Sequence, residues 1–180
     1  IKRDWLRFYK EVPKHFEDTT QGWDFAVKNT DTSDYCAGQV WGRVENKYYL
    51  LDSVRTRADF PRQIQLVIEF SKKWPNVLSK VVEDKANGTA VMDTLRNSIE
   101  GLIGYNPDKS KELRLQAVAP LFEAGNVYLP DPSIAPWVNE FIDELVSFPD
   151  SEHDDMVDSC SMSITKLRTN TSTLEALLNF

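Results

Sequence analysis

Two segments rich in aromatic and β-branched residues, 35–44 and 47–55, lie only two residues apart in the chain. This composition is typical of β-strands, and the short Glu45-Asn46 connection predicts a tight hairpin between them. A shorter apolar segment, 22–28 (GWDFAVK), comes before them, and the sequence NTDTSD at 29–34 has the composition of a turn. The first part of the chain therefore predicts an antiparallel meander of three strands.

After residue 60, apolar residues alternate between helix-like and strand-like spacing. We expect helices at 60–74, 88–99, 109–125 and 135–149, another beginning within 151–167, and strands at 77–84, 101–106 and 126–130. A meander followed by alternating strands and helices predicts an α/β fold with a mixed central sheet, in which the antiparallel meander is followed by parallel strands and helices cover both faces. Strand ends in such sheets commonly gather the functional residues.

Size and composition indicate an ordinary globular domain. The chain has 180 residues, of which 41% are apolar and 27% charged, and it has neither a signal-peptide pattern nor an apolar run long enough to span a membrane. Its two cysteines, Cys36 and Cys160, are expected to be reduced thiols in a cytoplasm. The chain begins at Ile1 rather than Met, so we expect it to be a piece of a longer protein.

The net charge of −7 argues against a surface built for nonspecific nucleic-acid binding, which would normally be basic. It does not exclude a nuclease, because the active site of a nuclease can itself be a cluster of acids. Where the acidic residues gather is therefore more informative than their number.

Acidic residues gather at three places: within the first strand, at the end of the strand at 77–84, and in the motif HDDMVD that opens the last helix. Each place has an ordinary explanation, since acids often face solvent, follow strands in turns, or sit favourably in the first turn of a helix. Together, however, they match the arrangement in which ribonuclease H-like nucleases hold two divalent metal ions. The acids concerned are Asp24, Glu83, Asp84, Asp154, Asp155 and Asp158.

Several blocks of the chain resemble the nuclease domain of phage terminase large subunits. The early blocks are GWDFAVK, SDYCAGQVWGR and KYYLLDSVR, and the later ones are EDKANGTA, KELRLQAVAPLFEAGNVYLP and HDDMVD, in the order found in that family. The resemblance extends from about Trp23 to Ser163. It implies a ribonuclease H-like fold, and a metal-dependent endonuclease that cleaves concatemeric double-stranded viral DNA during genome packaging.

The resemblance also implies a division of the chain. Residues 1–20 resemble the linker or arm that joins the ATPase domain of those proteins to the nuclease domain, which would here be residues 21–180. The chain contains no Walker A motif, G-x-x-x-x-G-K-[ST], so ATP hydrolysis is not expected of it.

The implied catalytic residues and metal ligands are Asp24, Glu83 and Asp155, with Asp154, Asp158 and Asp84 as further candidate ligands. Successive side chains of a strand point to opposite faces, so only one of Glu83 and Asp84 can face Asp24, and Glu83 is favoured. Asp34 and His153 lie close to these motifs, and the more ordinary roles of a turn cap and a helix cap are favoured for them.

Two Mg²⁺ or Mn²⁺ ions are the implied cofactors. Phosphodiester hydrolysis needs a water deprotonated near neutral pH and a leaving oxygen whose charge is neutralised, and two such ions can supply both. These hard cations prefer oxygen ligands, which suits a site made of carboxylates. Carboxylates packed together repel one another without metal, so at least one should have a raised pKa.

Four basic residues are candidates for contact with the DNA backbone: Lys85, Lys109, Lys111 and Arg114. Phosphate contacts of this kind carry no sequence preference and weaken as salt rises. Lys85, beside Glu83, would also steady the acidic cluster in the absence of metal.

The implied partners are double-stranded DNA and, in the full protein, an ATPase domain, a portal and a small terminase subunit, with no membrane and a location in the host-cell cytoplasm. Two alternatives stay open at this point. One is a junction resolvase of the same fold, and the other is a non-catalytic docking module of a packaging motor.

Overall fold

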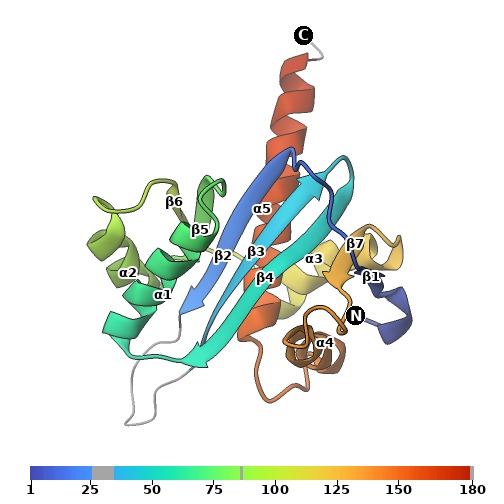
Figure 1. Cartoon of the computed structure of the whole chain (residues 1–180), viewed down its shortest axis with the longest axis horizontal. Coiled ribbons are helices and arrows are strands. Elements are labelled where there is room, and N and C mark those ends of the chain that lie inside the picture. Colours follow the sequence, from blue (N-terminus) through green and yellow to red (C-terminus); the bar gives the residue numbers. More distant parts are fainter. Residues whose placement is uncertain (26–34, 86, 179–180) are drawn as a thin grey trace.

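A computed structural model describes residues 1–25, 35–85 and 87–178, with side chains described as far as residue 169 and not at residue 87. Asp34, a candidate from the sequence, lies outside the described residues. Within the described part, the elements are η1 (Arg3–Trp5), β1 (Arg7–Tyr9), β2 (Asp18–Phe25), β3 (Tyr35–Val44), β4 (Lys47–Arg57), α1 (Phe60–Lys73), β5 (Ser79–Glu83), α2 (Asn87–Leu95), β6 (Leu102–Tyr105), α3 (Lys111–Glu123), β7 (Val127–Pro130), α4 (Val138–Ser147) and α5 (Asp155–Leu178) (Figure 1).

The described strands form one mixed sheet in the order β1-β7-β4-β3-β2-β5-β6. β2, β3 and β4 form the antiparallel meander at its centre, as predicted, and Glu45 adopts a φ of 52° in the β3–β4 hairpin. β5 runs parallel to β2 and β6 parallel to β5, while β7 runs parallel to β4 on the other side. The predicted fold class, an α/β fold with a mixed sheet and helices on both faces, is confirmed.

The N-terminal segment takes part in the same sheet. β1 pairs in parallel with β7 at one edge, and β2 already begins at Asp18. The segment 1–20 therefore contains an edge strand and the start of a central strand, separated by an irregular stretch around Pro13.

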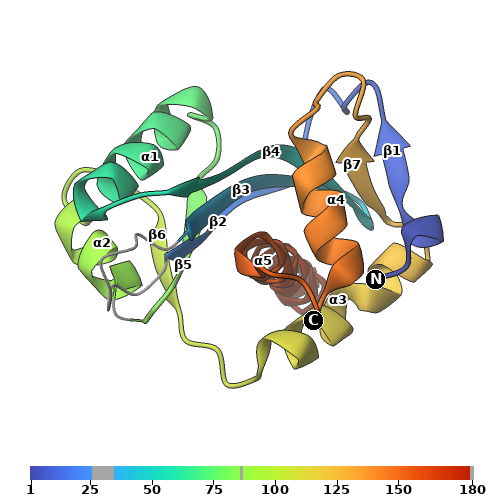
Figure 2. The same cartoon turned by 90° about the horizontal axis from the view of Figure 1, so that it is seen from below.

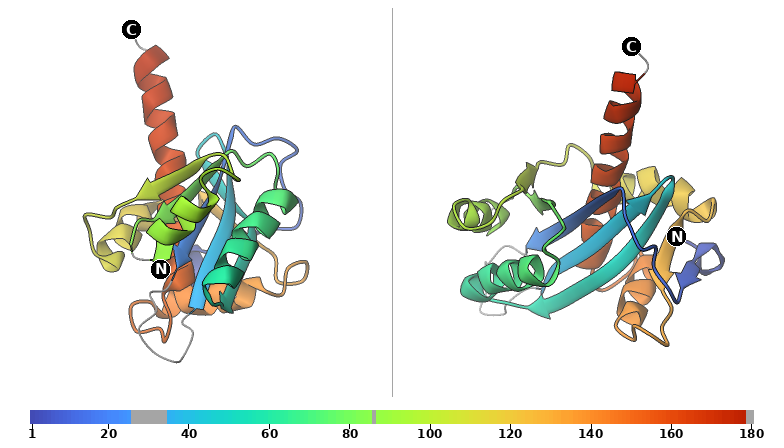
Figure 3. Two further views of the ribbon diagram at one scale, coloured as in Figure 1. Left: turned by 90° about the vertical axis from the view of Figure 1, so that its left-hand side faces the viewer. Right: turned by 45° about the horizontal axis from the view of Figure 1, so that its top comes forward.

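Helices cover the two faces of the sheet unequally, as Figure 2 shows. α3, α4 and α5 pack on one face around the fully buried Trp41, Phe122 and Phe141. α1 and α2 pack on the other face around Trp23 and Val67. In Figure 3 the C-terminal part of α5 extends beyond the sheet.

The first half of α5 lies very close to β2 because Gly22 has no side chain. The Ser159 hydroxyl donates a hydrogen bond of 2.7 Å to the Gly22 carbonyl. A Cβ atom at residue 22 would lie 2.2 Å from Ser163 Oγ and 2.7 Å from the Ser159 carbonyl oxygen. Small residues on both elements therefore set the distance between them. Asp24 lies two residues beyond Gly22 on the same face of β2, so this contact also sets how closely α5 approaches Asp24.

Both cysteines are buried and free. Among the described residues, no helix has both the length and the apolar character needed to cross a membrane.

Replacing Gly22 with alanine should destabilise the domain. The new methyl group would overlap a backbone oxygen, and overpacking of this kind costs about 1–3 kcal/mol. Urea unfolding of Gly22→Ala should show a loss of that size. Gly104→Ala in β6 is the matched control, since its nearest neighbour would be the flexible Met92 side chain at 3.3 Å. Equal stability of the two variants would contradict this account of the β2–α5 contact.

Candidate metal centre

Three carboxylates from distant parts of the chain meet beside the sheet. Asp24 comes from β2, Glu83 from the last position of β5, and Asp158 from the first turn of α5. Each offers an oxygen atom that lies within 4.8 Å of the other two. All three residues are buried, with 7%, 6% and 1% of their surface exposed, so their charges must be compensated within the protein or by a bound cation.

The strand register brings Asp24 and Glu83 together. Trp23 pairs with Val82 across the parallel β2–β5 ladder, and both side chains point into the core under α1 and α2. The next residues along the two strands are Asp24 and Glu83, which therefore point to the opposite face, where α5 lies. This is the geometry expected from the sequence for these two acids.

Asp84 points away from this group. It is exposed, and its side chain accepts a hydrogen bond of 2.6 Å from the Thr89 hydroxyl. The chain turns sharply here into α2, and a Cβ atom at Gly88 would lie 1.9 Å from the Glu83 carbonyl oxygen. The glycine that follows the acidic pair is therefore required for the turn that holds Glu83 in place.

Two basic residues of α3 reach into the acidic group. The Lys111 Nζ atom lies 2.5 Å from Asp158, 2.7 Å from Asp154 and 4.0 Å from Asp24. The Arg114 guanidinium lies 2.8 Å from Asp158 and 3.2 Å from Glu83. Lys85 adds a third positive charge 2.9 Å from Glu83, as expected from its position in the sequence.

The nearby positive charges offset the effect of burial on the pKa only partly at Asp24 and Asp158, whereas at Glu83 the opposing interactions outweigh it. Burial and the nearby Asp158 raise the pKa of Asp24 well above its usual range, although Lys111 opposes this shift. Burial raises the pKa of Asp158 to about 6. Burial would also raise the pKa of Glu83, but hydrogen bonds from Lys85 and Asp24 and the charge of Arg114 together lower it. The expectation of at least one raised pKa is confirmed.

The acid that the last helix contributes to this group is Asp158, whereas the sequence favoured Asp155. Asp158 comes directly before Ser159, the residue that contacts Gly22, so the packing of α5 turns it toward Asp24. Asp155 lies one turn earlier and is half-buried. Burial raises its pKa, and its charge helps to raise the pKa of Asp24. Asp154 pairs with Lys111 at the rim.

The four basic residues that the sequence suggested for DNA contact differ in exposure and in the direction of their side chains. Lys111 and Arg114 face the acids, and the Arg114 side chain is only 4% exposed. Their positive charges are therefore paired with carboxylates of the protein. Lys85 is more than half exposed while paired with Glu83. Lys109 is exposed in the connection before α3. His153 packs edge-on against Tyr35, with ring centroids 4.6 Å apart.

The residues of this group suit a divalent cation. Carboxylate oxygens are the ligands that Mg²⁺ and Mn²⁺ prefer. Neither buried oxygen of Asp158 has a hydrogen-bond partner of good geometry among the described residues, although both lie in ion pairs. Because these contacts are ionic, a divalent cation can bind Asp158 only in place of a resident positive charge.

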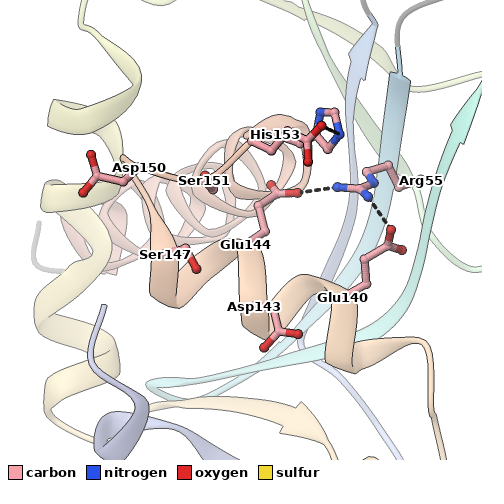
Figure 4. Close-up of a pocket in the computed structure, with 9 residues that line it drawn as sticks. Arg55, Glu140, Asp143, Glu144, Ser147, Asp150, Ser151 and His153 are labelled. Carbon is pink, nitrogen blue, oxygen red and sulfur yellow. Dashed lines mark hydrogen bonds and ion pairs between the residues drawn. The ribbon is translucent and has the colours of Figure 1, made fainter.

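A buried ion pair that the sequence analysis missed holds the start of α5. Glu144 of α4 accepts a hydrogen bond of 2.8 Å from the Val157 backbone N–H, and its other oxygen lies 3.1 Å from Arg55 of β4. Arg55 also pairs with Glu140 (Figure 4). Its guanidinium stacks on the Tyr35 ring. The available signal was an acid on the apolar face of a helix, in the sequence FIDELV.

This ion pair borders a pocket of about 340 Å³ that does not include the three clustered acids. It is formed by Arg55, by α4 and by the chain between α4 and α5, and its lining residues are Arg55, Glu140, Asp143, Glu144, Ser147, Asp150, Ser151, Glu152 and His153 (Figure 4). Its lining is mostly acidic, so it is a poor surface for the phosphates of DNA.

The sheet order and the convergence of two strand acids with one helix acid define a domain of the ribonuclease H-like class. A family model described as "Terminase RNaseH-like domain" matches residues 21–167. The chain therefore belongs to the terminase RNase H-like domain family, as the resemblance in its sequence indicated.

Solved structures agree on the fold. The zinc-bound large terminase nuclease of thermophilic phage G20c is 21% identical, with a TM-score of 0.64 over 90% of this chain and 94% of that one. The magnesium-bound structure of the G20c nuclease is 19% identical, with a TM-score of 0.64 over 90% and 93%. The large terminase of a second thermophilic bacteriophage is 13% identical, with a TM-score of 0.69 over 90% of this chain and 43% of that one. A search of curated proteins found no match.

Glu144 gives a testable pH dependence. Burial raises its pKa from 4.5 to about 7, so the folded state keeps a proton that the unfolded state loses between these pH values. The free energy of unfolding should therefore fall as pH rises from 4.5 to 7, by at most about 3 kcal/mol from this residue. Glu144→Gln should remove that part of the fall, so the variant should gain stability relative to wild type over this window.

Urea unfolding of both proteins at several pH values from 4.5 to 7.5 measures the effect. Glu140→Gln is the matched control, because it also removes an acid beside Arg55 but at a position whose side chain is 53% exposed. Parallel curves for wild type and Glu144→Gln would show that Glu144 does not titrate in this range.

Proposed function

We propose that this domain is a divalent-metal-dependent endonuclease that cuts double-stranded viral DNA during genome packaging. The observation that supports it most is the group of Asp24, Glu83 and Asp158, whose oxygens lie within 4.8 Å of one another in a buried setting. Membership of the terminase RNase H-like family and the likeness to large terminase nucleases support the same assignment.

In this proposal Asp24, Glu83 and Asp158 hold Mg²⁺ or Mn²⁺, with Asp155 and Asp154 as flanking acids. Such ions, when bound, lower the pKa of an attacking water and neutralise charge on the leaving oxygen. Arg114 keeps the orientation of Glu83 and Asp158, since it is buried and contacts both. Lys85 and Lys109 are both exposed, so they can contact DNA phosphates, and such contacts carry no sequence preference.

The family match supports a proposal about the longer protein in which this domain works. The chain spans 43% of the large terminase of the second thermophilic bacteriophage, a protein also solved in complex with ADP. We infer that this domain works in a longer protein with an ATPase domain, in contact with a portal and a small terminase subunit, in the cytoplasm of an infected cell. The terminase family match weighs against a junction resolvase.

Plasmid cleavage tests the activity. Supercoiled plasmid with Mn²⁺ should be nicked and linearised by the wild-type chain, and EDTA should stop the reaction. Asp158→Asn and Asp24→Asn should slow cleavage by at least about a hundredfold, the scale on which loss of one charge-stabilising group acts in an active site. Asp84→Asn, at the same strand end but facing away, should cleave like wild type.

Comparable rates for Asp158→Asn and wild type would contradict the proposed site. Wild-type cleavage that EDTA leaves unchanged would contradict a metal-dependent reaction. Cleavage confined to four-way junctions would instead favour a resolvase.

A further inference from the structure

Lys111 occupies a position that a metal ion would need. Its Nζ atom contacts Asp158 and Asp154 directly and lies 4.0 Å from Asp24. Two of these carboxylates belong to the three-acid group. An ammonium ion and a divalent cation cannot both sit against the same oxygens, because at such distances their charges repel strongly. Either the lysine leaves as the metal enters, or the metal is excluded.

Lys111 and Arg114 differ in how firmly they are held. The Arg114 side chain is 4% exposed and bridges Glu83 and Asp158 from within the core. The Lys111 side chain is 32% exposed and comes from the first residue of α3, next to the open connection that contains Lys109. A lysine side chain is a flexible stem with a compact charge, so Lys111 can swing toward solvent without disturbing the helix.

The charges around Lys111 explain why a lysine lies among these acids. Without Lys111, the three buried acids and Asp154 would face, among the described basic residues, only Arg114 and Lys85. The Lys111 ammonium group lies 2.5 Å from Asp158 and 2.7 Å from Asp154. Its positive charge therefore stabilises these acids in the absence of metal.

Building on the proposed function, we propose that Lys111 is an internal counter-cation that a divalent metal ion displaces, so that metal binding is an exchange of one cation for another. Metal affinity is then set partly by the strength of the lysine contacts. The displaced ammonium lies at the mouth of the site, where it can contact a DNA phosphate.

Replacing Lys111 with methionine tests the exchange. The metal-free variant should melt at a lower temperature than wild type, and its thermal midpoint should rise more when Mn²⁺ is added. Calorimetric titration should show Mn²⁺ binding about tenfold tighter or more than in wild type, because no resident charge has to leave. Lys111→Arg keeps the charge and should show no such gain, and Lys109→Met is the control for loss of a nearby exposed lysine.

Lysine labelling of the wild-type chain gives a second readout that needs no variant to fold. An amine-reactive reagent followed by mass spectrometry should modify Lys111 slowly without metal and several times faster with saturating Mg²⁺, while Lys109 should not change. Mn²⁺ affinity in Lys111→Met no tighter than in wild type, or Lys111 labelling unaffected by Mg²⁺, would overturn the exchange.

The two proposals fail in different ways. Mn²⁺ binding that persists unchanged in Asp158→Asn would show that the acidic group is not the metal site, which removes the proposed function and this inference together. Binding that Asp158→Asn abolishes, but that Lys111→Met leaves unaltered, would remove only the exchange.

Discussion

The close contact between α5 and β2 is the constraint on which the rest of this site depends. Gly22 leaves no side chain between the two elements, and the Ser159 hydroxyl bonds to its carbonyl oxygen. This contact lets a helix from the C-terminal part of the chain approach the central strand closely enough for Asp158 to meet Asp24. Glu144 fixes the same helix from the other side through the Val157 N–H group. The acids of this site are therefore positioned by packing, and not by the backbone of any single loop.

Such packing has an electrostatic cost that shapes the whole site. Three buried carboxylates cannot all be ionised without compensation. Burial accordingly raises the pKa values of Asp24 and Asp158. Lys111, Arg114 and Lys85 relieve part of it from within the chain. If basic side chains neutralised all of the buried carboxylates, the site would have little affinity for metal. Because they neutralise only part of this charge, binding of a cation is still favourable.

Much of the fold could be predicted from the sequence, because the spacing of apolar residues indicates which side chains face the core and so distinguishes helices from strands. The 35–44 and 47–55 strands, their hairpin and the later alternation of helices and strands follow from side-chain spacing. The pairing of Asp24 with Glu83 was also accessible, since Asp24 lies within one apolar strand and Glu83 at the end of another, and strand alternation favoured Glu83 over Asp84. The position of Asp158 beside Asp24 could not be predicted from the sequence. Asp155 and Asp158 share a helix face, and only tertiary packing determines which of them meets Asp24. The inward direction of Lys111 and Arg114 was equally hidden, since a basic helix start usually faces solvent.

The central claim is that Asp24, Glu83 and Asp158 form one cation-binding pocket. Diffraction at the manganese absorption edge, from crystals of this chain grown with Mn²⁺, tests it most directly. Anomalous peaks should lie in contact with carboxylate oxygens of all three residues. Ordered Mn²⁺ bound elsewhere, with these acids still paired to Lys111 and Arg114, would contradict it.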